Sequence, residues 1–308
     1  MKKKRILFNI TEDWFFLSHF LSRAKSARNA GYEIYVCCNE TNKRKTIESN
    51  GINFIKLPYK RSSINPIYEF YITIRIFLII NKIKPDIIHN IALKPIIIGS
   101  FGAILLNIKS VVNAPVGMGY VFTSNSLKAN FLKPILIFLL RKLLNPHNGL
   151  NKKNKVIFEN SDDLNYFVKL NAVKSKHACV ISGAGVEIDK KFHNIKRKNK
   201  VPKVALVARM LKDKGIYEFF EAYKILKYKN IECRFFLVGD VDPINPSSIE
   251  RKILEGWHKE KEIECLGNPE NFNPNLQFLY ATSKALNIKS KKKDFKLASY
   301  FFEKLYRA

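Results

Sequence analysis

The stretch Val204–Gly215, VALVARMLKDKG, combines residue types that suit the binding of a diphosphate. An apolar segment predicts a strand that leads into a loop carrying Arg209 and Lys214, and Gly215 then precedes a predicted helix. Both cations are hydrogen-bond donors with a fixed charge, and the free N–H groups of a helix N-terminus also attract anions. The alternative is that both are ordinary solvated charges, because Lys and Arg are abundant throughout this chain.

Several polar residues of the first half could contact a ligand or could serve only the fold. Glu12 and Asp13 lie in the first predicted loop, where they could act on a ligand hydroxyl or simply favour the N-terminus of the next helix. His19 lies in the first turns of that helix, and His89 ends a predicted strand. Each histidine could face a ligand or pack in the core. Lys94, near a later helix start, could contact an anionic ligand or remain solvated.

Two glycines occur in the segment Asn113–Ser124, NAPVGMGYVFTS. Because glycine has no Cβ, Gly117 and Gly119 would let the backbone pass close to a ligand. The alternative is a tight turn with no ligand beside it.

An alternation of predicted strands and helices positions these residues. Predicted strands cover Arg5–Ile10, Glu33–Cys38, Ile52–Lys56, Asp86–His89, Ser110–Asn113, Val156–Glu159, Ala178–Ser182, Val204–Val207, Arg234–Val238 and Glu262–Leu266. Predicted helices cover Phe15–Ala30, Thr41–Asn50, Pro66–Ile83, Gly215–Lys227 and Ser247–Lys259. This pattern predicts an α/β protein with doubly wound parallel sheets.

The Lys/Asn-rich stretch Asp189–Lys200 interrupts the alternation and predicts an interdomain linker. We therefore expect a first domain over residues 1–188, a linker over 189–200 and a second domain over 201–308. Two Rossmann-like units in tandem would place a ligand cleft between them, at the carboxyl ends of their strands.

Composition limits the classes of partner. The chain has 308 residues, 46% of them hydrophobic, as expected of a folded protein and not of a disordered one. Its formal charge of +28 suggests an anionic partner, but the lysines are spread along the chain and no nucleic-acid module occurs, so we expect no nucleic acid to bind. The five cysteines include no CxxC pair, which argues against a disulfide framework or a zinc site.

The sequence predicts neither a signal peptide nor a membrane span. Acidic residues interrupt the apolar run that follows the basic start, and no apolar run reaches the roughly 18–20 residues of a span. The segment Phe131–Leu140, flanked by Lys128, Lys133, Arg141 and Lys142, could lie on a membrane surface or form an ordinary core helix. We expect a cytoplasmic protein that is soluble or peripheral.

Seven segments together resemble one known family. They are WFFLSH (Trp14–His19), PDIIHNIALKP (Pro85–Pro95), NAPVGMGYVFTS (Asn113–Ser124), VIFENSDDLNYFV (Val156–Val168), ISGAGVEIDKKF (Ile181–Phe192), VARMLKDKG (Val207–Gly215) and LVGDVDPINPSSI (Leu237–Ile249). In this order they resemble the retaining glycosyltransferases of family 4, which have the two-domain GT-B architecture. The resemblance covers about residues 1–270, with Glu159 in place of the usual Gln.

The resemblance implies transfer of a hexose or N-acetylhexosamine from a UDP-linked donor to a polyprenyl-diphosphate-linked saccharide, in surface polysaccharide or glycan biosynthesis. Arg209 and Lys214 would stabilise the leaving diphosphate with no metal or other cofactor. Gly183 and Gly185 would join them on the donor side. The residues named above in the first half would lie on the acceptor side. The family subgroup is peripheral to the membrane, so contact with an anionic membrane at the inner face of the cell membrane is also implied.

The chain departs from the family pattern after about Asn271. Lys293 and Asp294 occupy positions where the family carries a Glu and a Gly, and Glu303 is too far downstream to match the second Glu. We therefore expect an incomplete second domain and impaired transfer. The alternative is a truncated, non-catalytic relative, either inert or a binding protein in an assembly complex.

Overall fold

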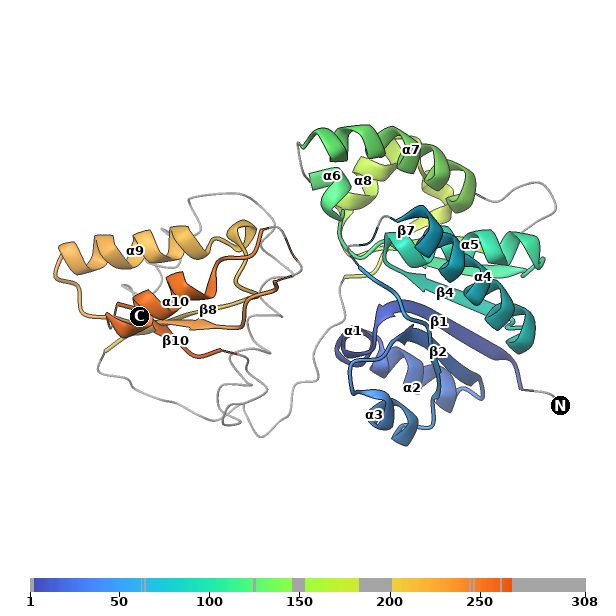
Figure 1. Ribbon diagram of the computed structural model, residues 1–308, viewed down its shortest axis with the longest axis horizontal. Coiled ribbons are helices and arrows are strands. Elements are labelled where there is room, and N and C mark those ends of the chain that lie inside the picture. Colours follow the sequence, from blue (N-terminus) through green and yellow to red (C-terminus); the bar gives the residue numbers. More distant parts are fainter. Residues whose placement is uncertain are drawn as a thin grey trace. The chain divides into compact units, whose positions relative to one another are not determined.

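The computed structural model describes residues 3–61, 63, 65–123, 126–145, 153–182, 201–243, 245, 247–260 and 262–267 (Figure 1). The chain divides into two compact units, residues 1–184 and 185–308. Each unit is described by itself below.

The first unit contains a sheet of seven parallel strands. They are β1 (Arg5–Glu12), β2 (Glu33–Asn39), β3 (Asn53–Lys56), β4 (Ile87–Ile91), β5 (Ser110–Ala114), β6 (Lys153–Phe158) and β7 (Ala178–Val180). Their order is β3-β2-β1-β4-β5-β6-β7, so the chain moves outward from β1 in one direction and then resumes beside β1 with β4. The carboxyl ends of β1 and β4 therefore flank a topological switch point, where ligands bind in open α/β sheets.

Helices cover both faces of this sheet. They are α1 (Asp13–His19), α2 (Leu21–Asn29), α3 (Arg44–Ser49), α4 (Pro66–Ile83), α5 (Leu93–Leu105), α6 (Tyr120–Thr123), α7 (Leu127–Leu144) and α8 (Ser161–Lys169), with a 3-10 turn at Ser175–His177. Alternation along β1 sends Phe8 to a cluster with α1 and α2, and Leu7 to a second cluster with α4 and α5. A third cluster joins α5, α7 and α8 to β6.

Helix α4 shows why these boundaries form. The Asn65 side chain accepts hydrogen bonds from the backbone N–H groups of Ile67 at 3.0 Å and Tyr68 at 3.3 Å, and Pro66 occupies the first helical position. Lys84 ends the helix in the left-handed conformation, at φ 49°. The buried Ile72, Ile76 and Ile80 recur every four residues and form the face that packs on the sheet.

The second unit has a parallel three-stranded sheet among its described residues. The strands β8 (Lys203–Val207), β9 (Arg234–Val238) and β10 (Glu264–Cys265) lie in the order β10-β9-β8. Helices α9 (Ile216–Tyr228) and α10 (Arg251–Lys259) pack on it, with a 3-10 turn at Lys212–Lys214 before α9. Phe220 and Trp257 stack between these helices, with ring centroids 4.0 Å apart.

The predicted α/β class with parallel, doubly wound sheets is confirmed. The single helix predicted over Phe15–Ala30 is wrong, because the chain breaks at Phe20, at φ −123° and ψ −10°, between α1 and α2. The predicted linker 189–200 and the divergent stretch after Asn271 lie outside the described residues. The domain boundaries and the cleft expected between the domains stay predictions.

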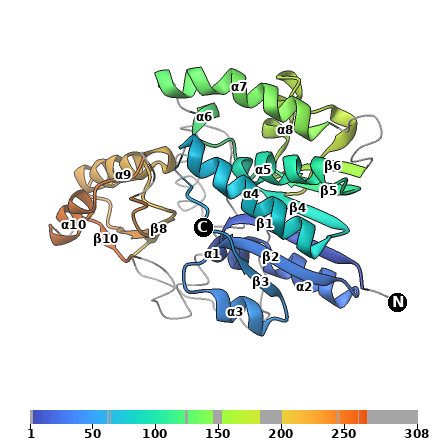
Figure 2. The ribbon, with the colours of Figure 1, turned by 45° about the vertical axis from the view of Figure 1, so that its right-hand side comes forward.

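Helices α4, α5 and α7 lie side by side on one face of the first sheet (Figures 1 and 2). The segment Phe131–Leu140 belongs to α7, whose Leu140 and Leu144 are buried. Within the described part of the chain, no helix combines the length and apolar character needed to cross a membrane.

Candidate functional site

Glu12 ends β1 at the switch point. Its side chain is almost fully buried, and Oε2 accepts a hydrogen bond from Asn39 Nδ2 at 3.1 Å. Burial raises the pKa of the Glu12 carboxyl above its usual value, although the Asn39 hydrogen bond and the nearby charge of Arg61 oppose the shift. This carboxylate is held at the carboxyl edge of the sheet and can accept a hydrogen bond from a ligand hydroxyl.

Asp13, the next residue, has a structural role. Its carboxylate accepts hydrogen bonds from the backbone N–H groups of Trp14 at 2.7 Å, Thr41 at 2.6 Å and Lys43 at 3.1 Å, and also from the Thr41 hydroxyl. The side chain is fully buried. Of the two roles open to it, Asp13 therefore serves the fold, because it fixes the loop between β2 and α3 to the start of α1.

Lys94, in the first turn of α5, also has a structural role. Its ammonium donates to Lys60 O at 2.6 Å, Ser63 O at 2.8 Å and Glu69 Oε1 at 2.7 Å. An ammonium has three donors, so these contacts use all of them. Lys94 ties the loop before α4 to α5 and does not present its charge to a ligand in this conformation.

Ala92 connects β4 to α5 in a strained conformation, with φ 76° and ψ 159°. Residues other than glycine rarely adopt this region, and it costs roughly 1–3 kcal/mol. The Ala92 N–H donates to Ala114 O at 2.9 Å, across the ends of β4 and β5. The surrounding structure therefore imposes this backbone geometry at the switch point.

His89 lies inside β4 and not at its end, because the strand continues to Ile91. Its ring packs 5.2 Å from the Phe8 centroid and 5.7 Å from that of Phe20, and its Nε2 is buried with no hydrogen-bond partner. Burial, and secondarily the charge of Arg23, lowers its pKa from 6.5 to about 3. The expectation that His89 ends a strand is wrong; its ring packs against Phe8 and Phe20, and the residue as a whole is partly buried.

His19 lies in the last turn of α1, not in the first turns of a long helix. Its Nδ1 is 2.6 Å from Ser18 Oγ, and its ring packs on Phe15 with centroids 4.5 Å apart. These contacts favour a packing role for His19.

Gly117 and Gly119 follow β5 in left-handed conformations, at φ 76° and φ 69°. A Cβ at Gly119 would lie 3.0 Å from Leu93 Cδ1, so the loop passes close to the start of α5. At Gly117 such a Cβ would have no atom within 4 Å, so the space beside this residue is open. Gly183 and Gly185 lie outside the described residues.

A row of buried asparagines crosses the sheet beneath this edge. Asn9 Nδ2 donates to Asn90 Oδ1 at 2.9 Å, Asn90 Nδ2 to Asn113 Oδ1 at 3.0 Å, and Asn113 Nδ2 to Asn154 Oδ1 at 3.2 Å. The four side chains come from β1, β4, β5 and β6, and all are at least 98% buried. We call this row the asparagine ladder.

Both ends of the asparagine ladder are satisfied. The buried Tyr59 hydroxyl donates to Asn9 Oδ1 at 2.8 Å, and Asn154 Nδ2 donates to Leu143 O at 3.1 Å in α7. Ser100 of α5 donates to Asn113 Oδ1 at 3.1 Å. A satisfied buried network specifies one arrangement of its strands and helices, so the ladder sets how the ends of β1, β4 and β5 are aligned.

In the second unit, Arg209 follows β8 at the carboxyl edge of the sheet. Its Nη1 donates to Asp242 Oδ2 at 2.6 Å, and Asp242 follows the neighbouring strand β9. The Arg209 side chain is 47% exposed, whereas that of Asp242 is 14% exposed. The guanidinium is therefore fixed at one nitrogen while much of it faces solvent.

The loops after β8 and β9 brace each other around this pair. Met210 N donates to Asp240 O at 3.0 Å, and Lys212 N donates to Ser247 O at 2.8 Å. A Cβ at Gly239 would lie 1.8 Å from Ala208 O, so only glycine permits this approach. The exposed Lys214 ends the 3-10 turn, and Gly215 then begins α9 at φ 75°. Arg209 and Lys214 thus bracket the path from β8 to the N-terminus of α9, as the sequence predicts.

Sequence reasoning missed Asp242 as the partner of Arg209 and Asn39 as the partner of Glu12. It also missed the asparagine ladder, although a signal was present. FNI, HNI and VNA each place an asparagine near the end of an otherwise apolar strand.

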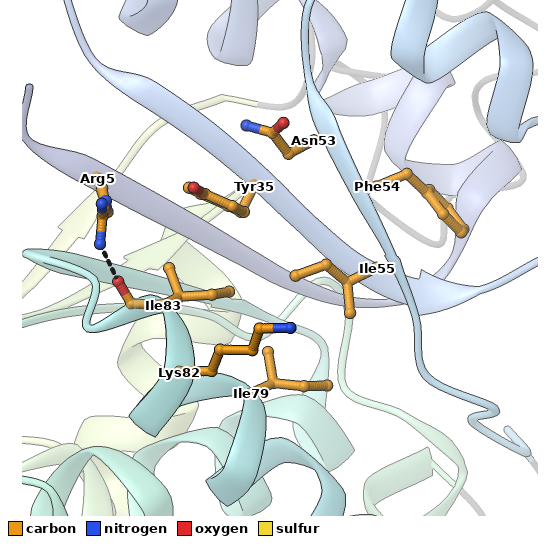
Figure 3. Close-up of a pocket in the computed structure, with 8 residues that line it drawn as sticks. All are labelled: Arg5, Tyr35, Asn53, Phe54, Ile55, Ile79, Lys82 and Ile83. Atoms are coloured by element: carbon orange, nitrogen blue, oxygen red, sulfur yellow. Dashed lines mark hydrogen bonds between the residues drawn. The ribbon is translucent and has the colours of Figure 1, made fainter.

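A pocket of about 460 Å³ lies elsewhere, at the amino edge of the first sheet (Figure 3). It is lined by Arg5, Tyr35, Asn53, Phe54, Ile55, Ile79, Lys82 and Ile83. Arg5 Nη1 donates to Ile83 O at 2.6 Å across it. Because ligands of doubly wound sheets bind at the carboxyl edge, we do not assign the reaction site to this pocket. In the described ranges, no group of three or more His, Cys, Asp or Glu side chains could hold a metal ion.

A family model described as glycosyl transferase 4-like matches residues 5–159. The chain is 25% identical, over 244 residues, to the N,N'-diacetylbacillosaminyl-diphospho-undecaprenol alpha-1,3-N-acetylgalactosaminyltransferase of Campylobacter jejuni. That match covers 75% of this chain and 61% of the relative.

Solved structures resemble the fold. Sucrose-phosphate synthase from Thermosynechococcus elongatus has a TM-score of 0.62 at 14% identity, covering 92% of this chain and 74% of that one. The HepE protein of Anabaena, in complex with UDP and glucose, has a TM-score of 0.60 at 13% identity, covering 90% of this chain and 72% of that one. At these identities the likeness concerns the fold alone.

Proposed function

The chain belongs to the glycosyl transferase 4-like family, and from that premise we propose that it transfers a hexose or N-acetylhexosamine from a nucleotide sugar to a lipid-linked saccharide. The observation that carries the proposal is the position of Arg209 at the carboxyl edge of β8, fixed by Asp242 and followed by the N-terminus of α9. The relative from Campylobacter jejuni supports the choice of acceptor, because its name specifies an undecaprenol diphosphate-linked sugar as its substrate.

We propose that Arg209 and Lys214 bind the diphosphate of a UDP-linked donor. Negative charge grows on the leaving diphosphate as the glycosidic bond breaks, and donors that are already in place lower the energy of that transition state. Asp242 accepts a hydrogen bond from Arg209 Nη1, and the Arg209 side chain is still 47% exposed. Two fixed cations and the N–H groups at the start of α9 would neutralise the leaving group without a resident cofactor.

On the acceptor side, we propose that Glu12 orients a sugar hydroxyl while the backbone at Gly117 and Gly119 lies against the sugar. The Glu12 carboxylate, held by Asn39 at the carboxyl edge of the sheet, would accept a hydrogen bond from that hydroxyl. The reaction would take place at the inner face of the cell membrane, because an undecaprenol-type acceptor is embedded there. Gly183 and Gly185 remain proposed donor-side residues.

A transfer assay tests this proposal. Purified protein receives labelled UDP-hexose or UDP-N-acetylhexosamine together with a polyprenyl-diphosphate-linked saccharide, and labelled glycolipid is counted. Arg209→Ala should lower the rate by roughly 100-fold or more, the usual cost of a lost transition-state donor. Arg234→Ala is a matched control, because Arg234 is 54% exposed and is also paired with an acid, Glu264, but lies at the start of β9.

Each outcome has a distinct meaning. Wild-type activity in Arg209→Ala would contradict the role of Arg209. UDP binding by the wild type with no transfer to any saccharide tested would favour a non-catalytic binding protein. Equal losses in Arg209→Ala and Arg234→Ala would indicate damage to the second unit and not to a reaction site.

A further inference from the structure

We propose that the outer face of α4, α5 and α7 is a docking surface for a bilayer that contains anionic lipid. The inference deepens the proposed function, on which it rests, because it names the surface that would bring the protein to a lipid-linked acceptor. It rests on three adjacent helices that expose large apolar side chains to solvent.

Helix α7 presents large apolar side chains to solvent along its length. Leu127 is 89% exposed, Phe131 72% and Phe138 57%, and Ile135 and Leu139 are also exposed. The spacing of three or four residues places them on one face of the helix. The opposite face contains Leu140 and Leu144, which are buried. An ordinary surface helix carries charged or polar residues on the face that α7 leaves apolar.

Helix α4 repeats this arrangement. Its inner face is formed by Ile72, Ile76 and Ile80, which are fully buried. Its outer face carries Ile67, 82% exposed, and Phe70, 67% exposed, followed by Tyr71, Ile74 and Leu78. Helix α5 contributes the exposed Phe101 and Leu105, which are one turn apart. Both faces of α4 are therefore apolar, although only the inner face packs on the sheet.

The three outer faces belong to one layer. Helix α5 contacts α4 along one side and α7 along the other, and both views show the three helices side by side (Figures 1 and 2). Monomeric proteins rarely expose contiguous apolar patches of more than a few hundred Å². An apolar layer of this extent indicates a partner that is itself apolar and broad.

The charges around this layer indicate an anionic partner. Exposed cations lie near the ends of the helices or between their apolar residues: Arg75, Lys82, Lys109, Arg141 and Lys142. Glu69 is the only acid within the three helices, and Lys94 neutralises it at 2.7 Å. Apolar side chains that enter the acyl region, together with cations at the headgroups, are the two elements of peripheral binding to anionic membranes.

The same charges disfavour a second copy of this chain as the occupant. The sequence carries a formal charge of +28, so two copies brought together through faces bordered by cations would repel each other. A bilayer with anionic headgroups gains from these charges. Charge complementarity therefore selects the lipid surface.

The surface also has a direction. Each of the three helices begins near the carboxyl edge of the sheet and ends near the amino edge, because each connects successive parallel strands. Ile67 and Leu127, in first turns, therefore lie toward the edge that carries Glu12 and Gly117, whereas Lys82 and Lys142 lie toward the other edge. Docking through this face would place the acceptor-side residues at the membrane.

Flotation with vesicles tests the inference. One set contains equal amounts of phosphatidylglycerol and phosphatidylcholine, and the other contains phosphatidylcholine alone. The wild type should float with the anionic vesicles only, and high salt should weaken this binding. A double variant that carries both Phe70→Ser and Phe131→Ser loses two exposed aromatic side chains and should bind the anionic vesicles at least about tenfold more weakly. The matched control is a double variant that carries both Ile225→Ser and Tyr228→Ser. These two side chains of α9 are 55% and 89% exposed.

Three results would overturn the inference. The wild type could fail to float with anionic vesicles, the Phe70/Phe131 variant could float as the wild type does, or the control pair could lose binding equally. Light scattering adds a fourth: if the wild type forms dimers in lipid-free buffer and the Phe70/Phe131 variant is monomeric, the face binds a second copy instead. UDP titration of both proteins separates docking from the proposed function, because UDP binding should persist in the docking variant, and circular dichroism should show that it is folded.

Discussion

Arg209 Nη1 donates to Asp242 Oδ2 at 2.6 Å, which joins the loop after β8 to the loop after β9. The Asp242 backbone N–H is itself fixed by Ser248 Oγ at 3.1 Å, and Asn245 N donates to Asp242 O at 2.8 Å. The carboxylate is thus carried by a turn with its own hydrogen bonds. A long, flexible Arg side chain held at one nitrogen loses less freedom when it binds an anion.

We predict that Asp242→Asn weakens UDP binding by about tenfold, or about 1.4 kcal/mol. The amide keeps the shape of Asp242 but loses the charge that orients the Arg209 guanidinium. Calorimetric titration of UDP measures the effect. The control is Asp240→Asn in the same loop, where Asp240 pairs with Arg251 at 2.8 Å. Tighter UDP binding by Asp242→Asn would show that Asp242 competes with the diphosphate and does not position Arg209.

Substitution by alanine should have opposite effects at two helical glycines, because Gly99 lies against the asparagine ladder and Gly256 does not. In Gly99→Ala the new Cβ would lie 1.9 Å from Asn90 Oδ1 and 2.6 Å from Asn9 Nδ2, so the ladder must separate. Breaking a buried network should lower the free energy of unfolding by about 2–4 kcal/mol. In Gly256→Ala the Cβ meets nothing within 4 Å, and the free energy of unfolding should rise by about 0.5–1 kcal/mol.

Urea denaturation of the two glycine variants measures both effects. A Gly99→Ala protein as stable as the wild type would show that the ladder does not constrain the packing of α5 on the sheet. The Gly256→Ala protein controls for the general effect of alanine in a helix.

The fold was predictable from the sequence because apolar runs of strand length alternate with turn residues. The interval Pro66–Ile83 was predicted as observed, since Asn65 and Pro66 give an unambiguous helix start and Lys84 precedes Pro85. The break at Phe20 was not predictable, because the residues around it favour a helix and the break results from packing in the tertiary structure. The end of β4 was also misplaced, since Asn90 suggests a turn until its buried partners are known.

The candidate site was predictable only in part. Arg209 and Lys214 were found because a strand, two cations and a glycine are close together in sequence. Asp13 and Lys94 have the right residue types and positions for ligand contact, but most of their partners are distant in sequence. Thr41 is 28 positions from Asp13, and Ser63 is 31 positions from Lys94. Such partners depend on the fold, so sequence spacing cannot distinguish a ligand contact from a structural one.

Lys94→Met should affect the fold and not the affinity for an acceptor. The substitution removes the ammonium that bonds to Lys60 O, Ser63 O and Glu69, so the loop before α4 should loosen and become a site of proteolysis. We expect a loss of about 1–3 kcal/mol of unfolding free energy. Limited proteolysis and urea denaturation measure this, with Lys109→Met as an exposed control. A stable variant with a raised KM for the acceptor would instead make Lys94 a ligand contact.

His89 predicts a pH dependence of stability. Its folded-state pKa of about 3 is below the ordinary value of 6.5, so the unfolded chain binds the proton first. Stability should therefore fall as the pH drops from 6.5 toward 3, by up to about 1.4 kcal/mol per pH unit from this group, and should be independent of His89 above that window. The raised pKa of Glu12 acts in the opposite sense, since its protonated form is favoured in the folded state.

Comparing the wild type with His89→Leu isolates this contribution, because all other groups titrate in both proteins. Urea denaturation at pH 5 and pH 7 should show a smaller loss on acidification for His89→Leu. The same loss in both proteins would mean that the His89 ring is protonated in the folded state.

The central claim is that the second unit binds a nucleotide diphosphate through Arg209, and calorimetric titration of UDP into the wild type and Arg209→Ala tests it most directly. The account predicts that the wild type binds UDP and that Arg209→Ala, still folded by circular dichroism, does not, whereas Arg234→Ala binds as the wild type does. A folded wild type that binds no UDP, or an Arg209→Ala protein that binds it with unchanged affinity, would contradict the account.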